Sequence, residues 1–383
     1  MPDLVFNDAV AGAGIIGLAT AYHLARRGRR VVVFERSARA SGASIRNFGM
    51  LWPIGQPAGQ DRALALRSLE IWSNVLQDAR LWHDPCGSLH LAYRDDEARV
   101  LDEFARGDAS SGLGGELIGP EKVGRIAPGV RLDGLQCAYR SPTEVCVDPR
   151  EIIAGLPGFL ADSLGVRFEF GRAVVGFDRP SLRLGDGERC SADRLWVCPG
   201  SDLETLYPEV YRDQGVVLCK LQMLRTEPIE HPWRLGPMLA AGLTLRHYRS
   251  FEGCPSLASL RERVARETPQ LDRFGIHVMA SQNGRGEVIV GDSHEYGDAI
   301  EPFDRTEIET LILDYLREFL DVPGFRIAAR WNGIYAKHPT KPALTARPAP
   351  GATVIACLGG AGMTLSFGIA ERAVIDVLEG NGR

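Results

Sequence analysis

The 383-residue chain lacks several features that would restrict its class at once. None of its eight cysteines forms a C-x-x-C pair, which argues against a zinc site and against a redox-active dithiol. No uninterrupted run of about 20 apolar residues occurs, so we expect no transmembrane helix. Positive charge is not in excess, since the formal net charge is −5, and nothing favours a nucleic-acid partner.

The remaining composition is that of a folded globular protein, with 45% hydrophobic and 24% charged residues. The length suits one large domain or two intertwined ones. Scattered single cysteines indicate reduced thiols in a cytoplasmic protein. Residues 9–25 are apolar, but acidic Asp3 and Asp8 precede them where a signal peptide has a basic region, so we expect no targeting segment.

The first part of the chain carries a dinucleotide-binding pattern. A strand-like apolar stretch precedes Gly12-x-Gly14-x-x-Gly17, a helical pattern follows it, and a second apolar strand ends at Glu35. This context predicts a pyrophosphate at the helix N-terminus and a ribose hydroxyl on Glu35. The pattern does not by itself separate NAD from FAD.

Two more predicted strands end in glycine-rich turns. One ends at Pro199-Gly200, before a helix-like stretch over residues 201–206. The other covers residues 353–357 and continues into Leu358-Gly359-Gly360-Ala361-Gly362-Met363-Thr364, before a helix that ends near residue 378. A nicotinamide enzyme needs only the N-terminal turn, whereas a site built from both ends of the chain suits the larger FAD.

The middle of the chain has a different pattern. Alternating and β-branched residues predict strands over residues 215–225, 246–251, 277–281 and 288–291, and these favour a largely antiparallel sheet. Asp148 before Pro149 predicts the N-cap of a helix. The expected fold is α/β (α+β): a Rossmann-type FAD-binding domain of residues 1–84, 142–214 and 325–383, intertwined with a largely antiparallel substrate domain of residues 85–141 and 215–324.

The combined motifs resemble the D-amino-acid oxidase superfamily of FAD enzymes, which includes glycine oxidase and sarcosine oxidase. The resemblance rests on the first glycine motif, Glu35-Arg36, Gly42-Ala43-Ser44-x-Arg46-Asn47, Val197-Cys198-Pro199-Gly200 and Gly359-Gly360-x-Gly362-Met363-Thr364. The shorter stretches SIRNFGMLWPIGQP, MASQNG, VGDSHEYG and WNGIYAKHP are similar to a bacterial branch associated with aminophosphonate breakdown, which implies 2-aminoethylphosphonate or an N-methylated form as substrate.

The resemblance implies an FAD site built from most of the chain. Its residues would be Gly12, Gly14, Ile15, Ile16, Gly17, Glu35, Arg36, Ser41, Ala43, Ser44, Arg46, Asn47, Val174, Pro199, Gly200, Gly360, Gly362, Met363 and Thr364. Residues 334–344, where sarcosine oxidase carries a covalent flavin, contain no cysteine, so we expect non-covalent FAD. Ser281-Gln282-Asn283 stand where sarcosine oxidase has its oxygen-activating lysine. The electron acceptor, O2 or another, therefore stays open, with an oxidase favoured.

The implied reaction oxidises a C–N bond by hydride transfer to flavin N5, followed by hydrolysis of the imine. An oxidase or dehydrogenase of glycine, sarcosine or a D-amino acid is the first alternative. A nicotinamide dehydrogenase, a flavin monooxygenase and a non-catalytic FAD-binding scaffold are the others.

An anionic amine substrate needs a cation in the pocket. The candidates are Arg46, Arg246, Arg330, Lys337 and His338. Arg46 could contact either FAD or the substrate, and FAD is favoured. Trp52 and Trp331 could wall the site or pack in the core, and His294 is better explained as a turn residue than as a base. We expect no metal site. Whether the protein forms a homo-oligomer stays open.

Overall fold

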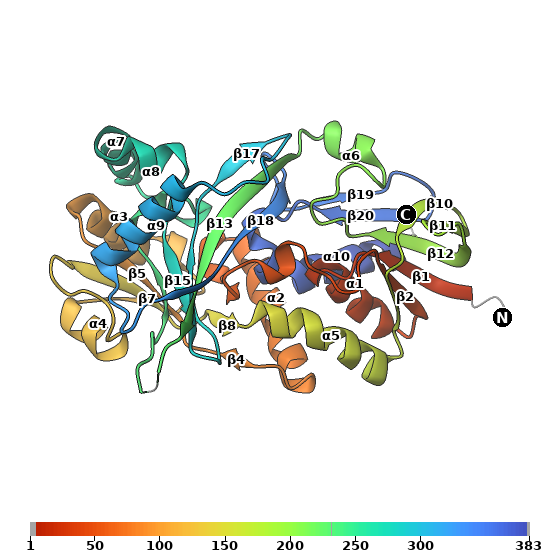
Figure 1. Ribbon diagram of the computed structural model, residues 1–383, viewed down its shortest axis with the longest axis horizontal. Helices are drawn as coiled ribbons and strands as arrows, with labels where there is room; N and C mark the ends of the chain where they lie inside the picture. Colours follow the sequence, from red (N-terminus) through yellow and green to blue (C-terminus); the bar gives the residue numbers. More distant parts are fainter. Residues whose placement is uncertain (1–4, 231, 381–383) are drawn as a thin grey trace.

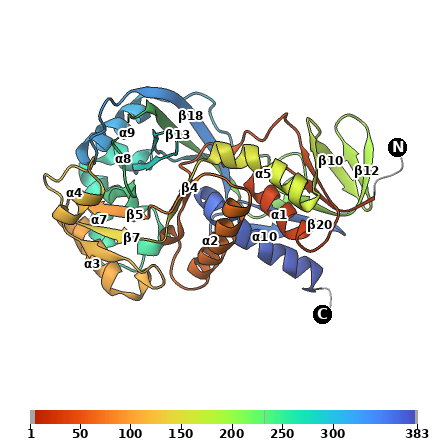
Figure 2. The same cartoon turned by 90° about the horizontal axis from the view of Figure 1, so that it is seen from below.

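The computed structural model describes residues 5–230 and 232–380 as two large β-sheets with helices packed around them (Figure 1). One end of the molecule contains β1, β2, β12, α1 and α10, and the opposite end contains α3, α4, α7, α8 and α9 (Figures 1 and 2). Strands β13 and β18 lie between the two ends (Figure 1). Within the described residues, no helix has the length and apolarity needed to span a membrane.

The first sheet has eight strands around a parallel centre in the order β20, β12, β1, β2 and β9. The antiparallel strands β10, β11 and β19 extend it. The strands are β1 (Val5–Ala11), β2 (Val31–Glu35), β9 (Arg167–Phe170), β10 (Val174–Asp178), β11 (Ser181–Leu184), β12 (Arg189–Val197), β19 (Leu344–Ala346) and β20 (Ala352–Ala356).

Helices α1 (Ile15–Ala25) and α5 (Pro149–Leu164) contact strands of this sheet, and α10 (Gly362–Leu378) and α2 (Gln60–Asp78) are connected to them by helix–helix contacts. Helix α1 packs against α5 and α10, and α10 packs against α2. Nearly all of α1 is buried because it is enclosed by the sheet and these helices. Trp72 of α2 donates its indole N–H to the carbonyl oxygen of Met363 at 2.8 Å, which fixes the start of α10.

The second sheet has nine strands in the order β17, β13, β16, β15, β14, β5, β7 and β6, with β18 also paired to β13. All pairs are antiparallel except β14 with β5. The strands are β5 (Ser88–Ala92), β6 (Glu116–Ile118), β7 (Cys137–Ser141), β13 (Val217–Pro228), β14 (Met238–Ala240), β15 (Met279–Gln282), β16 (Glu287–Gly291), β17 (Glu295–Gly297) and β18 (Ile327–Lys337).

Helices and a small sheet complete the fold. The remaining helices are α3 (Asp95–Arg106), α4 (Pro120–Ile126), α6 (Pro208–Arg212), α7 (Leu257–Glu267), α8 (Pro269–Arg273) and α9 (Thr306–Phe319). The third sheet joins β3 (Met50–Leu51), β8 (Val145–Val147) and β4 (His83–Asp84). Short 3-10 helices are η1 (Ala43–Ile45), η2 (Pro53–Gly55), η3 (Asp108–Ser110), η4 (Gly242–Arg246), η5 (Arg249–Phe251) and η6 (Gly359–Ala361).

The predicted fold class is confirmed, and so is the N-cap of α5, where Asp148 accepts a hydrogen bond from the backbone nitrogen of Arg150. Three local predictions are wrong. Residues 201–206 are not helical, residues 246–251 contain parts of two 3-10 helices instead of a strand, and β15 begins only at Met279. Burial does not alternate along residues 246–251: residues 246–248 are partly buried, Arg249 is exposed, and Ser250 and Phe251 are buried. The segment therefore has no single buried strand face. The domain division stays a prediction.

Candidate active site

The glycines of the first motif allow close packing at the carboxyl ends of β1 and β12. Gly12 has a φ of +105°, and a Cβ there would overlap the carbonyl oxygen of Cys198. A Cβ on Gly17 would overlap the carbonyl oxygen of Gly12. Gly14 is the N-cap of α1 and has no side-chain capping bond. The helix therefore presents its N-terminal N–H groups and positive dipole end at this edge of the sheet, as an anion site requires.

Glu35 lies beside this turn at the end of β2. Its carboxylate accepts hydrogen bonds from the backbone nitrogens of Ala13 and Ser37, both at 3.0 Å. The next residue, Arg36, is more than half exposed and forms an ion pair with Asp202. The acid predicted to bind a ribose is thus fixed in place next to the glycine turn.

The loop after β2 reaches back to α1. The hydroxyl of Ser44 accepts a hydrogen bond from the backbone nitrogen of Ile15 at 3.0 Å. The amide of Asn47 holds the loop in shape, because it donates to the carbonyl oxygens of Ala43 and Ser44 and accepts from the backbone nitrogen of Gly49. Asn47 therefore supports the loop in addition to any contact with a cofactor.

Arg46 connects this loop to β18. Its Nε donates to the carbonyl oxygen of Ser41 at 2.8 Å, and its Nη1 donates to that of Asn332 at 3.1 Å. The indole N–H of Trp331 donates to the carbonyl oxygen of Arg46 at 3.3 Å. Trp331 lies in a separate hollow with Asp148 and Arg150, so it supports the loop from behind.

A cavity runs from the start of α1 to the second sheet. Many of the predicted site residues line it: Ile15, Ile16, Ala43, Ser44, Arg46, Asn47, Gly200, Lys337, His338, Gly360, Gly362, Met363 and Thr364. The predicted residues outside its lining are Gly12, Gly14, Gly17, Glu35, Arg36, Ser41, Val174, Pro199, Arg246, Arg330 and Trp331. Val174 is buried in β10. The sequence leaves two roles for Trp52, packing in the core or forming a wall of the site. Its side chain is buried, with 4% exposed, and it lines the cavity.

Helix α10 begins at the wall of this cavity. The hydroxyl of Thr364 accepts a hydrogen bond from the backbone nitrogen of Trp52 at 2.8 Å, which ties the helix start to the loop before α2. The N-cap residue of α10, Ala361, provides no side-chain capping bond. Two helix N-termini, those of α1 and α10, therefore meet one cavity and favour negative charge in it.

The structure places some of the basic residues predicted to bind the substrate anion outside the cavity and others in it. Arg246 forms an ion pair with Asp272 and donates to the carbonyl oxygen of Ile276, outside the cavity lining. Arg330 is ion-paired with Glu309 and half exposed. Both arginines are occupied by partners within the protein.

Lys337 and His338 lie in the cavity. The Lys337 ammonium is 3.2 Å from the hydroxyl oxygen of Tyr296 and 4.9 Å from the centre of its ring. His338 Nδ1 accepts hydrogen bonds from the backbone nitrogens of Thr340 and Lys341, and burial lowers its pKa. His338 is therefore a neutral residue that shapes the loop. Lys337 is one of the cations on the cavity wall, which also include Arg46, Arg249 and Lys341.

Sequence reasoning missed a polar group on the same wall. His247, His277, His294 and Asp292 all line the cavity. His294 was interpreted as a turn residue, and His277 and Asp292 were not assigned to the site. The four residues come from three separated segments, and the only signal in the sequence is that three of its eight histidines lie in this region.

A model of the family "FAD dependent oxidoreductase" matches residues 9–374. The chain belongs to this family. The match confirms the predicted superfamily and its cofactor, FAD, and it covers both glycine-rich ends of the cavity. The bifunctional tRNA 5-methylaminomethyl-2-thiouridine biosynthesis protein MnmC of Chromohalobacter salexigens is 30% identical over 223 residues, which are 52% of this chain and 29% of that protein. The chain thus matches less than a third of the length of this relative.

Solved structures of the family share the whole fold. Glycine oxidase from Geobacillus kaustophilus has a TM-score of 0.77 at 19% identity and covers 98% of this chain and 95% of its own. The L-alpha-glycerophosphate oxidase of Mycoplasma pneumoniae, solved with FAD bound, has a TM-score of 0.71 at 13% identity, with 97% and 94% covered. At these identities the likeness shows the fold alone.

The residues of the site fit FAD. Neither Gly12 nor Gly17 has room for a Cβ atom, so the backbone of this turn is kept free of side chains. Glu35 lies at the end of the neighbouring strand β2. The two helix N-termini suit the pyrophosphate at α1 and the electron-rich edge of a reduced flavin at α10. Residues 334–344 contain no cysteine that could form a covalent link.

Proposed function

We propose that the protein oxidises the C–N bond of a small anionic amine, with 2-aminoethylphosphonate or an N-methylated form as the substrate. The observation that carries this proposal is the cavity itself. It joins the start of α10, where the flavin ring fits, to a wall that presents Lys337. A substrate with an amine at one end and an oxyanion at the other matches this arrangement.

FAD, when bound, accepts the hydride from the carbon next to the amine. The protein's part is to hold that carbon in place. Lys337 supplies the positive charge that pairs with the oxyanion of the substrate, and the hydroxyl of Tyr296 keeps the Lys337 ammonium in position. The α10 N-terminus offers backbone N–H groups and a positive dipole end to the flavin edge.

Burial excludes water from the reacting carbon. Trp52, Leu221 and Tyr335 line the cavity and are each less than a tenth exposed. Burial raises the pKa of Tyr335, so its hydroxyl stays protonated and can donate a hydrogen bond. An apolar wall with a few fixed polar groups is the usual composition of a small-molecule site.

A direct measurement tests the proposed phosphonate substrate against carboxylate amines. The purified holoenzyme is mixed anaerobically with glycine, sarcosine, a D-amino acid, 2-aminoethylphosphonate or N-methyl-2-aminoethylphosphonate, and the flavin absorbance is followed. Fast bleaching by the aminophosphonates supports the proposal. Bleaching by carboxylates alone favours a glycine-, sarcosine- or D-amino-acid-oxidising enzyme instead. No bleaching by any amine would leave an FAD-binding scaffold.

A further inference from the structure

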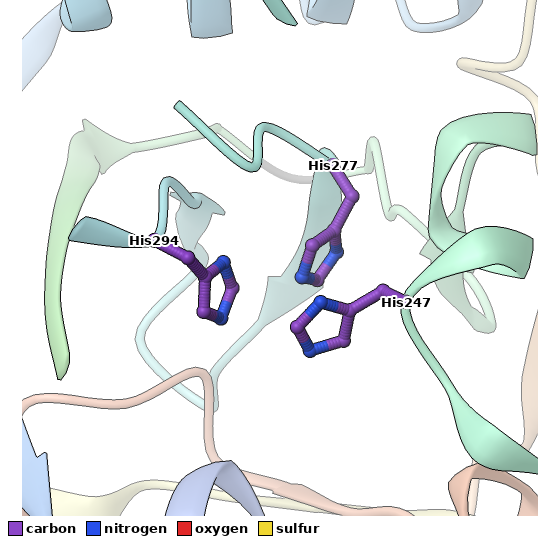
Figure 3. Close-up of side chains that lie close together, drawn as sticks. All are labelled: His247, His277 and His294. Atoms are coloured by element: carbon purple, nitrogen blue, oxygen red, sulfur yellow. The ribbon is translucent and has the colours of Figure 1, made fainter. Parts of the chain in front are cut away.

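Three histidines gather on the cavity wall without forming hydrogen bonds to one another. His247 follows η4, His277 precedes β15, and His294 follows β16 (Figure 3). One ring nitrogen of each lies within 4.8 Å of one ring nitrogen of each of the others. The ring centres of His247 and His277 are 3.9 Å apart, and those of His247 and His294 are 4.4 Å apart.

The His277 ring and the Asp292 side chain beside it have buried polar atoms without hydrogen-bond partners. In the part of the chain that the structure describes, neither ring nitrogen of His277 has a hydrogen-bond partner, although this side chain is 3% exposed. Oδ1 of Asp292 is also buried without a hydrogen bond, 3.3 Å from His277 Nε2. Buried polar groups are nearly always satisfied, so an unpaired group in a cavity indicates a ligand.

Outer contacts orient two of the rings. His294 Nδ1 lies 3.2 Å from the carbonyl oxygen of Gly275, which can only accept, so the proton is on Nδ1 and the lone pair is on Nε2. The Asp292 carboxylate lies beside His277 Nε2, which favours a proton there and a lone pair on Nδ1. Metal-bound histidines usually donate the N–H of the ring nitrogen that does not bind the metal to a carbonyl or carboxylate oxygen, and these two rings have such an oxygen nearby.

We propose that His247, His277 and His294 bind a divalent transition-metal ion, with Zn²⁺ the best match. Three histidines with an open fourth position are a known zinc arrangement, and imidazole suits zinc among the common metals. The sequence alone predicted no metal ligand, because no spacing rule connects residues from three separate segments.

One acid and two basic side chains lie close to the three rings. Asp292 is the acid beside the rings, with its Oδ1 3.3 Å from His277 Nε2. Arg246 and Lys337 are both close enough to oppose a bound cation. Arg246 is paired with Asp272, and Lys337 contacts the hydroxyl of Tyr296.

Binding requires a small adjustment of the rings. Two nitrogens on a tetrahedral zinc are about 3.3 Å apart, given Zn–N bonds of about 2.0 Å. The donor atoms lie within 4.8 Å of one another, so they must approach by up to about 1.5 Å through side-chain rotation. The open position of the ion would face the cavity that these residues line.

The test uses the purified holoenzyme, freed of metal by dialysis against a chelator and checked for retained flavin. Titration with ZnCl₂ should show one site per chain, and crystals should give one anomalous peak among the three rings at the zinc edge. His277→Ala and His294→Ala should abolish this binding. Asp292→Asn should weaken it about 10-fold, the usual effect of losing an outer contact.

His83→Ala is the matched control, because His83 lies on β4 outside the cavity lining, and it should bind zinc like the wild type. If a variant loses flavin or unfolds, the anomalous peak of the wild type still decides the question. Absence of one-site zinc binding in the wild type overturns the proposal. Binding of inorganic phosphate that protects the protein against heat, with no zinc bound, would make the cluster an oxyanion site and also overturn it.

Discussion

The hydroxyl oxygen of Ser44 lies 3.0 Å from the backbone nitrogen of Ile15 and accepts its hydrogen bond. The first residue of α1 is therefore satisfied by a side chain from the loop after β2, and not by its own helix. This contact joins the two segments that we assign to the FAD pyrophosphate. The loop and the glycine turn consequently form one surface.

Ser44→Ala should weaken FAD binding by about 5- to 10-fold, the value of one neutral hydrogen bond. FAD fluorescence quenching on titration of the apoprotein gives the dissociation constant. Ser73→Ala, which removes a hydroxyl bonded to the Leu69 carbonyl oxygen in α2, is the control and should leave affinity unchanged. Equal affinity in both variants would show that Ser44 has no part in the FAD site.

Gly17→Ala should prevent stable flavin binding, because the new Cβ would overlap the carbonyl oxygen of Gly12 and push α1 off the sheet. We expect a loss of stability of about 2 kcal/mol or more. Gly158→Ala is the control, since this glycine of α5 has open space around it and alanine favours a helix. Flavin content and denaturant unfolding measure both effects. A yellow, stable Gly17→Ala protein would contradict the close packing.

The sequence predicts the strand–turn–helix elements at both glycine-rich ends of the chain, because their signals are local. A strand, a glycine turn and a helix lie within a few residues at Gly12 and again at Gly359. The loop after β2 was also predicted, and the structure places Ala43, Ser44, Arg46 and Asn47 in the cavity.

The substrate end could not be predicted in the same way. Arg246 has the right chemistry, but Asp272 occupies it, and only the tertiary fold brings these two residues together. The histidine cluster depends on three segments that meet in space. The residues around Arg246 pack on several sides, so alternation suggested a strand where two 3-10 helices form.

Arg46→Ala tests whether this side chain serves the cofactor or the substrate. Because Arg46 is held by the carbonyl oxygens of Ser41 and Asn332 at the FAD end, we expect a raised FAD dissociation constant. With FAD saturating, the KM for the amine should stay within about 2-fold of wild type. The opposite pattern, unchanged FAD affinity with a raised KM, would assign Arg46 to the substrate.

Lys337→Ala should raise the KM for an anionic amine by about 10- to 100-fold, because a charge-assisted contact of about 1.5–3 kcal/mol is lost. Lys337→Arg should recover part of this loss. Arg330→Ala is the control, since Arg330 pairs with Glu309 at the surface, and its KM should not change. Steady-state kinetics over a range of substrate concentration separates KM from kcat. Equal KM values in the Lys337→Ala and Arg330→Ala enzymes would remove Lys337 from the site.

The stability of the fold should fall in mild acid, in part through His23. Burial lowers the pKa of His23 to about 4 from 6.5, and its Nε2 lies 3.0 Å from the carbonyl oxygen of Phe367. The unfolded chain binds the proton more readily, so the contribution is complete above pH 6.5 and is lost as pH falls towards 4. The loss amounts to about 3 kcal/mol.

His23→Gln keeps a donor for the Phe367 carbonyl oxygen and removes the titration. Its free energy of unfolding should therefore depend less on pH between 6.5 and 4 than that of the wild type. Denaturant unfolding at several pH values measures the difference. His83→Gln, a change outside the core, should keep the wild-type dependence, and a His23→Gln curve parallel to wild type would refute the assignment.

The packing of α1 against α10 sets the order in which the protein can be completed on the ribosome. Within the described residues, β20 and α10 are synthesised after every other strand and helix of the first sheet. Nevertheless α10 packs against α1, and β20 pairs with β12. The nascent N-terminal half must therefore carry an unfinished apolar surface while the whole substrate region is translated. Flavin capture becomes a late event, and we expect chaperones to hold the chain until then.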